Sequence, residues 1–347
     1  MTATLRRFMG HRLAWPLIAV IVLIAADEVA RPAFLSIRMQ DGHLYGNVVD
    51  ILRNGAPIAL IGLGMTLVIA SRGIDLSVGA VVAIAGAISC SYIVSTHHQG
   101  TLSAALVGVA IAIAAGLVLG AWNGFLVSTL GIQPIIATLV LMVAGRGVAQ
   151  LITSGQIITI HNSYYHAIGD GYVLTLPIPV LITMAAFVLA GILTRRTALG
   201  TLIEAIGINP VASRLTGIRA GTIVWIVYVV SGLCATVAGL MITSNVSAAD
   251  ANNAGLFIEL DAILAVVLGG TSLRGGRYSL VGTIVGAFVL STLTTTVYNF
   301  GIPANENLVF EAPVVIAVVL LQSERRRELL DLWRRRRIRS QVSEVPA

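Results

Sequence analysis

The stretch GMTLVIASRGIDLSVGAVVAIAGA, residues Gly64–Ala87, joins two apolar segments through a short polar connection. The connection reads SRGIDLS and is too short to form a domain of its own. A membrane helix needs about 20 mostly apolar residues. The stretch therefore predicts two membrane-spanning helices separated by a polar break, with Asp75 close to the apolar interior.

The rest of the chain is similarly apolar. It has 347 residues, of which 56% are hydrophobic and only 11% are charged, whereas soluble domains have about 25% charged residues. We expect an all-α polytopic membrane protein with about ten transmembrane helices, some of them broken near the bilayer midplane. The expected spans are Leu13–Val29, Gly55–Ser71, Leu76–Val94, Leu102–Leu126, Pro134–Thr153, Leu174–Leu193, Thr222–Thr243, Leu260–Thr271, Leu280–Tyr298 and Pro313–Gln322. The eighth and tenth are too short to cross alone as drawn.

The arginines predict the orientation, because cytoplasmic loops of membrane proteins carry an excess of positive charge. All 22 basic residues are arginine, gathered at the two ends and in a few short loops. This pattern predicts a cytoplasmic tail over residues 1–12, a membrane domain over 13–322 and a cytoplasmic arginine-rich tail over 323–347. The first external loop is an exception with three arginines, and its segment Leu44–Leu52 is expected to lie along the outer membrane surface. The first apolar run lacks a clear cleavage site and is expected to be retained as a helix.

Several classes of function are disfavoured by what the sequence lacks. A P-loop needs a lysine on the nucleotide phosphates, and the chain has no lysine. Its arginine runs are not part of a nucleic-acid-binding motif, so no nucleic-acid partner is expected. The histidines, such as His97, His98, His161 and His166, match no metal-binding motif. We therefore expect no metal, no cofactor and no catalytic site of the chain's own.

The longest polar connection between spans is Thr194–Gly221. Apolar residues recur in it at helical spacing until Asn209 and Pro210 interrupt the pattern. The sequence predicts two short helices joined by a turn on the cytoplasmic side. A solvated loop and a docking element for a cytoplasmic partner both fit this pattern.

Polar residues at membrane depth need an explanation. Asp75 and Ser77 could simply cap the following helix, or they could mark a helix break that lines a polar path. A second glycine-rich break, Leu268–Arg277, lies in the C-terminal half. Arg146 lies inside the fifth span, where an arginine costs about 2.5 to 3.5 kcal/mol.

Arg146 must therefore face protein or water, or extend toward an interface. A structural partner such as Asp261 or Glu259 and a contact with substrate are equally plausible roles for it. Asn123 and Gln133 are polar residues in similar positions.

Three segments together resemble a known family. Gly64–Ala87 and ELDAILAVVLGGTSLRGGRYSLVGTIVGA, residues Glu259–Ala287, are similar to two signatures of carbohydrate ABC-importer permeases of the ribose, galactose and xylose type. ALGTLIEAIGINPVASRLTGI, residues Ala198–Ile218, is similar to the coupling region of that family. The segments Gln40–Ala70 and Ser247–Gly270 more specifically resemble the galactofuranose permeases.

The resemblance implies a multi-pass bacterial inner-membrane protein that imports a monosaccharide, with galactofuranose as the first candidate. It implies three protein partners: a cytoplasmic ABC ATPase, a periplasmic sugar-binding protein and a second permease that is identical or paralogous. Coupling to the ATPase would fall to Glu204, Ala205, Gly207, Asn209, Arg214 and Gly217. Our hypothesis for residues that line or support the sugar path is Asp75, Ser77, Asn123, Arg146 and Asp261.

The main alternative is a stand-alone secondary transporter driven by an ion gradient. Such a protein would favour acidic residues deep within several spans. Here the acidic residues lie mostly near the span ends, as Asp75 and Glu259 do. Dependence of uptake on ATP or on a cation gradient would separate the two functions.

Overall fold

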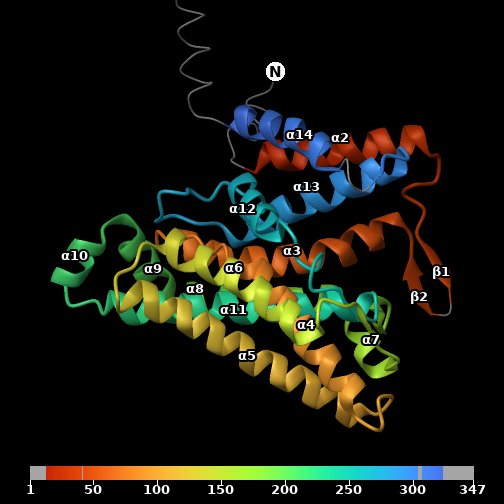
Figure 1. The fold of residues 1–347 in the computed structure, drawn as a ribbon. Helices are drawn as coiled ribbons and strands as arrows, with labels where there is room; N and C mark the ends of the chain where they lie inside the picture. Colours follow the sequence, from red (N-terminus) through yellow and green to blue (C-terminus); the bar gives the residue numbers. More distant parts are fainter. Residues whose placement is uncertain (1–12, 41, 304–306, 323–347) are drawn as a thin grey trace, which may run out of the picture.

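The computed structural model describes residues 13–40, 42–303 and 307–322, and these form a bundle of helices (Figure 1). The two predicted tails, 1–12 and 323–347, lie outside the described residues. Each of the ten expected spans coincides with a helix. These helices are α2 (Ala14–Ala30), α3 (Asn47–Ala70), α4 (Val78–Ser95), α5 (Leu102–Ser128), α6 (Pro134–Thr153), α8 (Ile178–Arg196), α11 (Ala220–Asn245), α12 (Ile258–Leu268), α13 (Leu280–Asn299) and α14 (Asn307–Gln322).

Seven helices in the described part of the chain are long and apolar enough to cross a membrane. The remaining three of the ten are shorter, with 17 residues in α2, 11 in α12 and 16 in α14. The eighth span is therefore short, as predicted, whereas the tenth begins at Asn307, upstream of the expected Pro313, and reaches the end of the described residues. Because α12 is followed by a glycine-rich connection rather than by more helix, it is a short helix that ends inside the bundle.

Small elements gather at the two ends of the bundle. The helices α9 (Leu199–Ile208) and α10 (Pro210–Leu215) lie at one end, and α7 (Ser163–Asp170) lies at the other (Figure 1). Three antiparallel two-stranded pairs, β1–β2, β3–β6 and β4–β5, complete the described structure. Their strands are β1 (Arg38–Gln40), β2 (His43–Tyr45), β3 (Ile158–Thr159), β4 (Tyr172–Val173), β5 (Leu176–Pro177) and β6 (Ala248–Ala249).

The expectation for Leu44–Leu52 was wrong. Leu44 belongs to β2, and the remainder of the segment forms the first turns of α3. Arg53, on the same turns, forms ion pairs with Asp50 at 3.1 Å and with Asp170 of α7. The first turns of α3 thus carry polar residues because they contact a neighbouring element, and this gives the segment its amphipathic pattern.

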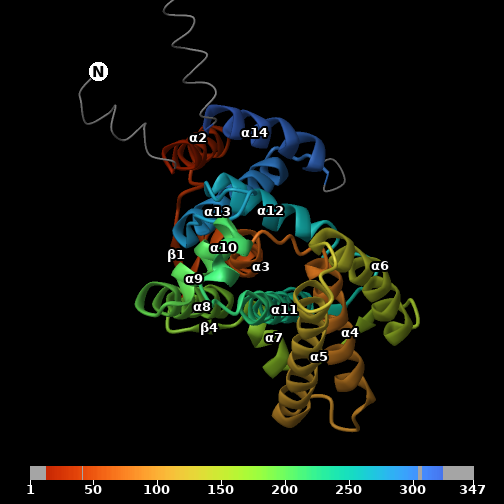
Figure 2. The same cartoon turned by 90° about the vertical axis from the view of Figure 1, so that its left-hand side faces the viewer.

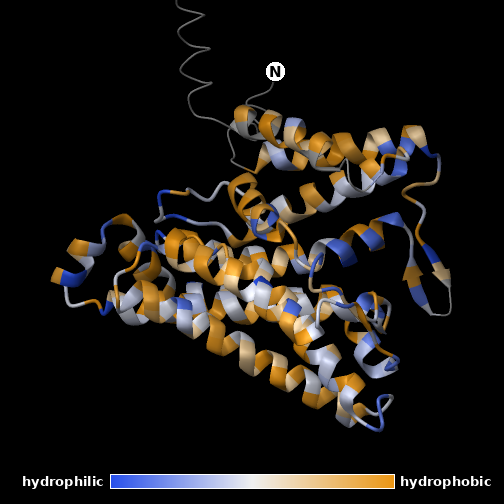
Figure 3. Ribbon diagram, in the orientation of Figure 1, coloured by the Kyte–Doolittle hydropathy of each residue, from blue (hydrophilic) through white to orange (hydrophobic). Residues whose placement is uncertain are grey.

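The core of the bundle is built from α3, α4, α11 and α13. In the most apolar window of each helix, 78% of α3 and 72% of α4 is buried, against 28% of both α5 and α6 and 22% of α8. Apolar residues accordingly cover the outer surface of α5 and α6 as well as the interior (Figure 3). This is the distribution expected when the surroundings of the bundle are themselves apolar.

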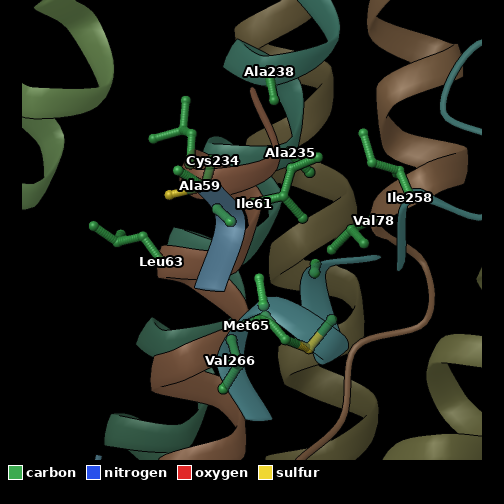
Figure 4. Close-up of a cluster of buried hydrophobic side chains, with 14 of the residues drawn as sticks. Ala59, Ile61, Leu63, Met65, Val78, Cys234, Ala235, Ala238, Ile258 and Val266 are labelled. Carbon is green, nitrogen blue, oxygen red and sulfur yellow. The ribbon is translucent and has the colours of Figure 1, made fainter. Parts of the chain in front are cut away.

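Small residues allow the central helices to approach closely. A Cβ added to Gly62 would fall closer than 3.0 Å to the side chain of Thr283, and one added to Gly64 would do the same to the backbone of Ser231. Around these contacts, side chains from α3, α4, α11 and α12 form the main hydrophobic cluster (Figure 4). The close packing positions the two polar breaks beside one another.

Candidate functional site

The break between α3 and α4 encloses a buried carboxylate. Helix α3 ends at Ala70, and Arg72 then adopts a positive φ of 68° that turns the chain. The side chain of Asp75 is only 2% exposed. Its Oδ1 accepts hydrogen bonds from the backbone N–H of Ser77 at 3.1 Å and from the Ser77 hydroxyl at 2.6 Å. Its Oδ2 accepts a hydrogen bond from the hydroxyl of Ser231 at 2.7 Å.

These bonds extend into a cluster that joins three helices. The Nδ2 of Asn123, on α5, donates to the Ser77 hydroxyl at 2.8 Å. We call Asp75, Ser77, Asn123 and Ser231 the Asp75 cluster. A buried charge is costly unless it is hydrogen-bonded, and here the break, α5 and α11 all contribute to its environment. The cluster therefore ties the conformation of the break to the positions of α5 and α11.

The Asp75 cluster differs from a simple helix cap. Ser77 is the N-cap residue of α4, but its side chain makes no capping hydrogen bond to that helix. Its hydroxyl instead connects Asp75 to Asn123. Two further buried groups nearby, the Oδ1 of Asn123 and the hydroxyl of Tyr228, have no hydrogen-bond partner within the described residues. The possibility that the Ser77 side chain caps the next helix is therefore excluded in this structure.

A second feature joins both breaks to α9. The backbone N–H of Gly276, in the connection between α12 and α13, donates to the carbonyl of Ala70 at 2.9 Å. Arg72 donates through Nε to the carbonyl of Arg274 at 3.2 Å and through Nη2 to the carbonyl of Ile208 at 3.0 Å. Residues far apart in the sequence thus meet at one point. We call this contact the coupling junction, and it comprises Ala70, Arg72, Gly207, Ile208, Arg274 and Gly276.

Gly207 is essential to the close approach in the coupling junction. A Cβ at this position would lie closer than 3.0 Å to the carbonyl oxygen of Ala70 and to the backbone nitrogen of Gly276. Both are main-chain atoms, which cannot rotate away as a flexible side chain can. Any side chain at this position would push the end of α9 away from the two breaks.

The predicted pair of short helices is confirmed in α9 and α10. The Oδ1 of Asn209 accepts hydrogen bonds from the backbone N–H groups of Val211 at 3.1 Å and Ala212 at 3.0 Å, which caps α10. On the inner face of α9, Ile203 and Ile206 are buried. They belong to a hydrophobic cluster with residues of α3 and α11. The pair is thus packed firmly against the bundle.

The outer face of the same helix pair carries exposed apolar side chains. The exposed fraction is 63% for Ile208, 68% for Val211 and 83% for Leu215. Arg214 is exposed beside them, and Glu204 is partly buried. A connection that only links two spans through water is not expected to expose three large apolar side chains together. This face therefore has the composition of a protein-docking surface.

The other residues predicted for the coupling role divide between the two faces. Ala205 is partly buried on α9, whereas Asn209 and Gly217 are exposed. Gly217 has a φ of 85°, and nothing lies within 4 Å of the place where its Cβ would be. Gly207 and Gly217 are therefore needed for different reasons, close packing in the first case and backbone conformation in the second.

Arg146 binds backbone carbonyls rather than a carboxylate. Its Nη1 donates to the carbonyl oxygens of Ala251 at 3.2 Å and Ala254 at 2.5 Å, and its Nη2 donates to that of Gly255 at 3.3 Å. Glu259 attracts Arg146 electrostatically without an ion pair between them among the described residues, and the expectation that Glu259 or Asp261 is its structural partner stays a prediction. The carbonyl groups of the loop before α12 can accept these bonds because that loop leaves them outside any regular helix.

The loop that holds Arg146 has its own internal order. The Oδ1 and Oδ2 of Asp250 accept hydrogen bonds from Asn253, and Oδ1 accepts one from the backbone of Asn252. The bond from the Asn253 side chain is the main cause that holds the pKa of Asp250 below its ordinary value. Asp261 lies further on, in the first turn of α12. It is not among the residues that hydrogen-bond Asp75.

The described residues contain no group of three or more His, Cys, Asp or Glu side chains that could hold a metal ion. Sequence reasoning missed Arg72, Ser231 and Tyr228 as members of the polar site. The sequence contained a signal that could have identified Arg72, since each glycine-rich break contains an arginine next to a glycine. Ser231 and Tyr228 lie in an otherwise ordinary span, and only packing brings them to the break.

Fold and site define a multi-pass helical membrane protein built around two broken helices. Residues 47–319 match the family described as branched-chain amino acid transport system / permease component, and the chain belongs to this family. It is 47% identical over 320 residues to the galactofuranose transporter permease protein YtfT of Escherichia coli, an alignment that covers 91% of this chain and 92% of that protein.

Two further relatives align over most of their lengths. The fructose import permease protein FruF of Bifidobacterium longum is 38% identical over 349 residues, with 99% of this chain and 96% of that protein covered. The ribose import permease protein RbsC of Escherichia coli is 38% identical over 313 residues, with 89% and 93% covered. No solved structure matches the chain. The resemblance to sugar permeases inferred from the motifs is thus confirmed.

Proposed function

We propose that this chain is the membrane-spanning subunit of an ABC importer that moves a monosaccharide into the bacterial cytoplasm. The relatives named for galactofuranose, fructose and ribose transport support a sugar as the substrate. Galactofuranose is the first candidate because YtfT shares 47% of its aligned residues with this chain. The chain lacks lysine and hence a P-loop of its own, so ATP is hydrolysed by a separate subunit.

The α9–α10 pair is the docking element for that ATPase. The observation that carries this proposal is the two-sided character of the pair. Its outer face carries Ile208, Val211 and Leu215 in exposed positions, while its end joins the two breaks through Arg72. A force on the outer face is therefore transmitted to both broken helices. Such rigid coupling between a docked subunit and broken helices suits transport by alternating access.

Within this mechanism the proposed coupling residues have separate tasks. Gly207 allows the close contact with the breaks, Asn209 holds α10 in place, and Gly217 supplies the turn that leads back to α11. Glu204, Ala205 and Arg214 provide contacts with the ATPase.

The proposed sugar path runs between this chain and a second permease, identical or paralogous. Asp75, Ser77 and Asn123 support the path by fixing the conformation of the break, since their side chains are buried in this structure. Arg146 supports it by holding the loop before α12, where Asp261 begins the helix. A periplasmic sugar-binding protein delivers the substrate at the end that carries α7. This orientation places α9, α10 and both termini in the cytoplasm, and the protein in the inner membrane.

Uptake in reconstituted vesicles tests the proposal. The vesicles contain this chain, its ATPase, its binding protein and any second permease encoded beside it, with or without internal ATP. Labelled galactofuranose is supplied, and fructose, ribose and leucine are added in turn as competitors. We expect ATP-dependent accumulation that a sugar inhibits and leucine does not. Inhibition by leucine alone would favour an amino-acid importer, and accumulation by this chain alone under an ion gradient would favour a secondary transporter.

A further inference from the structure

A groove on the outside of the bundle has a different character from the polar breaks. It has a volume of about 630 Å³ and is bordered by α3, α8 and α13. These three helices lie on one side of the molecule, with α3 between the other two (Figure 2). Side chains such as Ala56, Phe187, Val188 and Ile284 line it. Its walls are therefore almost entirely apolar.

Charged groups in the groove are confined to one end. Thr183 is the lining residue with a hydroxyl group, and this hydroxyl donates to the carbonyl of Ala56 at 3.0 Å. The charged lining residues are Arg195 and Arg196, which form the last turn of α8. Both are exposed, and neither guanidinium has an ion pair or a side-chain hydrogen bond with another residue that the structure describes. The groove thus combines an apolar trough with two exposed cations at its end.

The groove is long enough to hold one chain of a lipid. Its lining on α8 extends from Val180 to Arg196, which corresponds to about 24 Å at 1.5 Å per residue. The hydrocarbon core of a bilayer is about 30 Å thick, so the acyl chains of one leaflet extend over about 15 Å, which is less than the length of the trough. An acyl chain that lies along the trough would place its headgroup phosphate beside the two arginines. A guanidinium group is well suited to bind a phosphate with two hydrogen bonds.

We propose that this groove binds one anionic phospholipid, with an acyl chain along α3, α8 and α13 and the phosphate on Arg195 and Arg196. A lipid is favoured over a second protein chain because a long apolar trough that ends at two exposed cations is complementary to an acyl chain joined to an anionic headgroup. Basic pockets between membrane helices are known to select anionic headgroups. The bound lipid would fasten the end of α8 beside α9, next to the coupling junction.

Lipid binding to the purified full-length chain tests this proposal. The protein is prepared in neutral detergent and titrated with phosphatidylglycerol or with phosphatidylcholine that has the same acyl chains. Native mass spectrometry then counts the bound lipids and reports the oligomeric state. We expect one phosphatidylglycerol to bind more tightly than phosphatidylcholine.

Two variants test the two parts of the groove separately. Arg195→Gln with Arg196→Gln removes the cations, and the affinity for phosphatidylglycerol should fall roughly fivefold for each arginine. Gly191→Leu fills the trough, since a Cβ on Gly191 meets nothing within 4 Å and Gly191 lines the groove. This variant should lower the affinity for both lipids while the fold is kept.

The control is Arg219→Gln with Arg277→Gln, which removes two exposed arginines from the same end of the bundle but outside the groove. Its affinity for phosphatidylglycerol should equal that of the wild type, and thermal unfolding without lipid should show that all variants are folded. Equal loss of affinity in this control would show only a general attraction to positive charge and would overturn the site. Unchanged phosphatidylglycerol binding in either groove variant would also overturn the proposed site. A groove variant whose only effect is to dissociate an oligomer would overturn it as well.

Discussion

The two breaks use the same residue type in different ways. Ser77 begins α4 and Ser279 begins α13, each as the N-cap residue. The hydroxyl of Ser279 accepts a hydrogen bond from the backbone N–H of Gly282 at 3.0 Å, so it caps its own helix. The hydroxyl of Ser77 leaves its helix uncapped and bonds Asp75 and Asn123 instead. The serine of the first break therefore bonds to groups outside its helix, whereas the serine of the second break bonds to its own helix.

This difference follows from the depth of the two breaks. Asp75 is enclosed by α4, α5 and α11, where a charge must be satisfied by groups from neighbouring helices. The second break carries Arg274 and Arg277 in exposed positions, where water satisfies them. Its backbone is closed locally, because the N–H of Ser279 donates to the hydroxyl of Thr271 at 3.2 Å. We infer that the first break responds to movements of the bundle and the second mainly transmits them.

The largest effect is expected at Asp75. Asp75→Ala removes the acceptor of three hydrogen bonds and leaves buried hydroxyl groups without their partner. It should lower the stability by about 3 kcal/mol or more. Asp75→Asn keeps the shape and at least one acceptor oxygen, so it should cost less than half as much. Thermal unfolding in detergent measures both, and equal losses would show that the negative charge matters more than the hydrogen bonds.

The second prediction separates packing from conformation in the coupling region. Gly207→Ala forces α9 away from Ala70 and Gly276, and it should cost about 2 kcal/mol and most of the ATP-dependent uptake. Gly217→Ala is the matched control, because its Cβ enters open space and only its positive φ is unfavourable. That change should cost about 1 kcal/mol. Uptake per folded protein compares the two, and an active Gly207→Ala protein would contradict a role for the coupling junction.

The same substitution at the two N-cap serines sharpens the comparison of the breaks. Ser279→Ala removes one capping bond and should cost about 1 kcal/mol. Ser77→Ala removes a donor to Asp75 and the acceptor for Asn123, so it should cost about 2 kcal/mol. Melting temperatures of the two variants provide the measurement. If Ser279→Ala proved the more damaging, the first break would not depend on its neighbouring helices as we infer.

The smallest effect on stability is expected for Arg72→Gln. The side chain is exposed and donates to the carbonyls of Arg274 and Ile208. In the variant, water can donate to these carbonyls in place of the guanidinium group. We expect a loss of about 1 kcal/mol or less. Uptake should decline further than stability does, because the link from α9 to both breaks is cut. Stimulation of the ATPase without sugar uptake would be the signature of such uncoupling, and normal uptake would argue against it.

Much of the architecture follows from local sequence. Ten apolar runs predicted the ten main helices, since the length of a membrane helix is set by the bilayer and its backbone must bond internally. Asn209 and Pro210 marked the turn between α9 and α10, because the asparagine caps the next helix and proline fits its first turn. The segment Leu44–Leu52 was misjudged because its local pattern does not reveal that most of it forms the first turns of the long helix α3.

The tertiary structure alone decided which groups meet. Ser231 bonds to Asp75, Arg146 bonds to carbonyls more than 100 residues away, and Gly207 touches the backbone of both breaks. Periodicity reports which residues are apolar along one segment, but it carries no information on partners from other segments. The sequence by itself determined that this chain crosses a membrane through broken helices and has a pair of short helices between two spans. Helix packing determined how the breaks are held, because buried polar groups take whichever partners the fold brings within hydrogen-bonding distance.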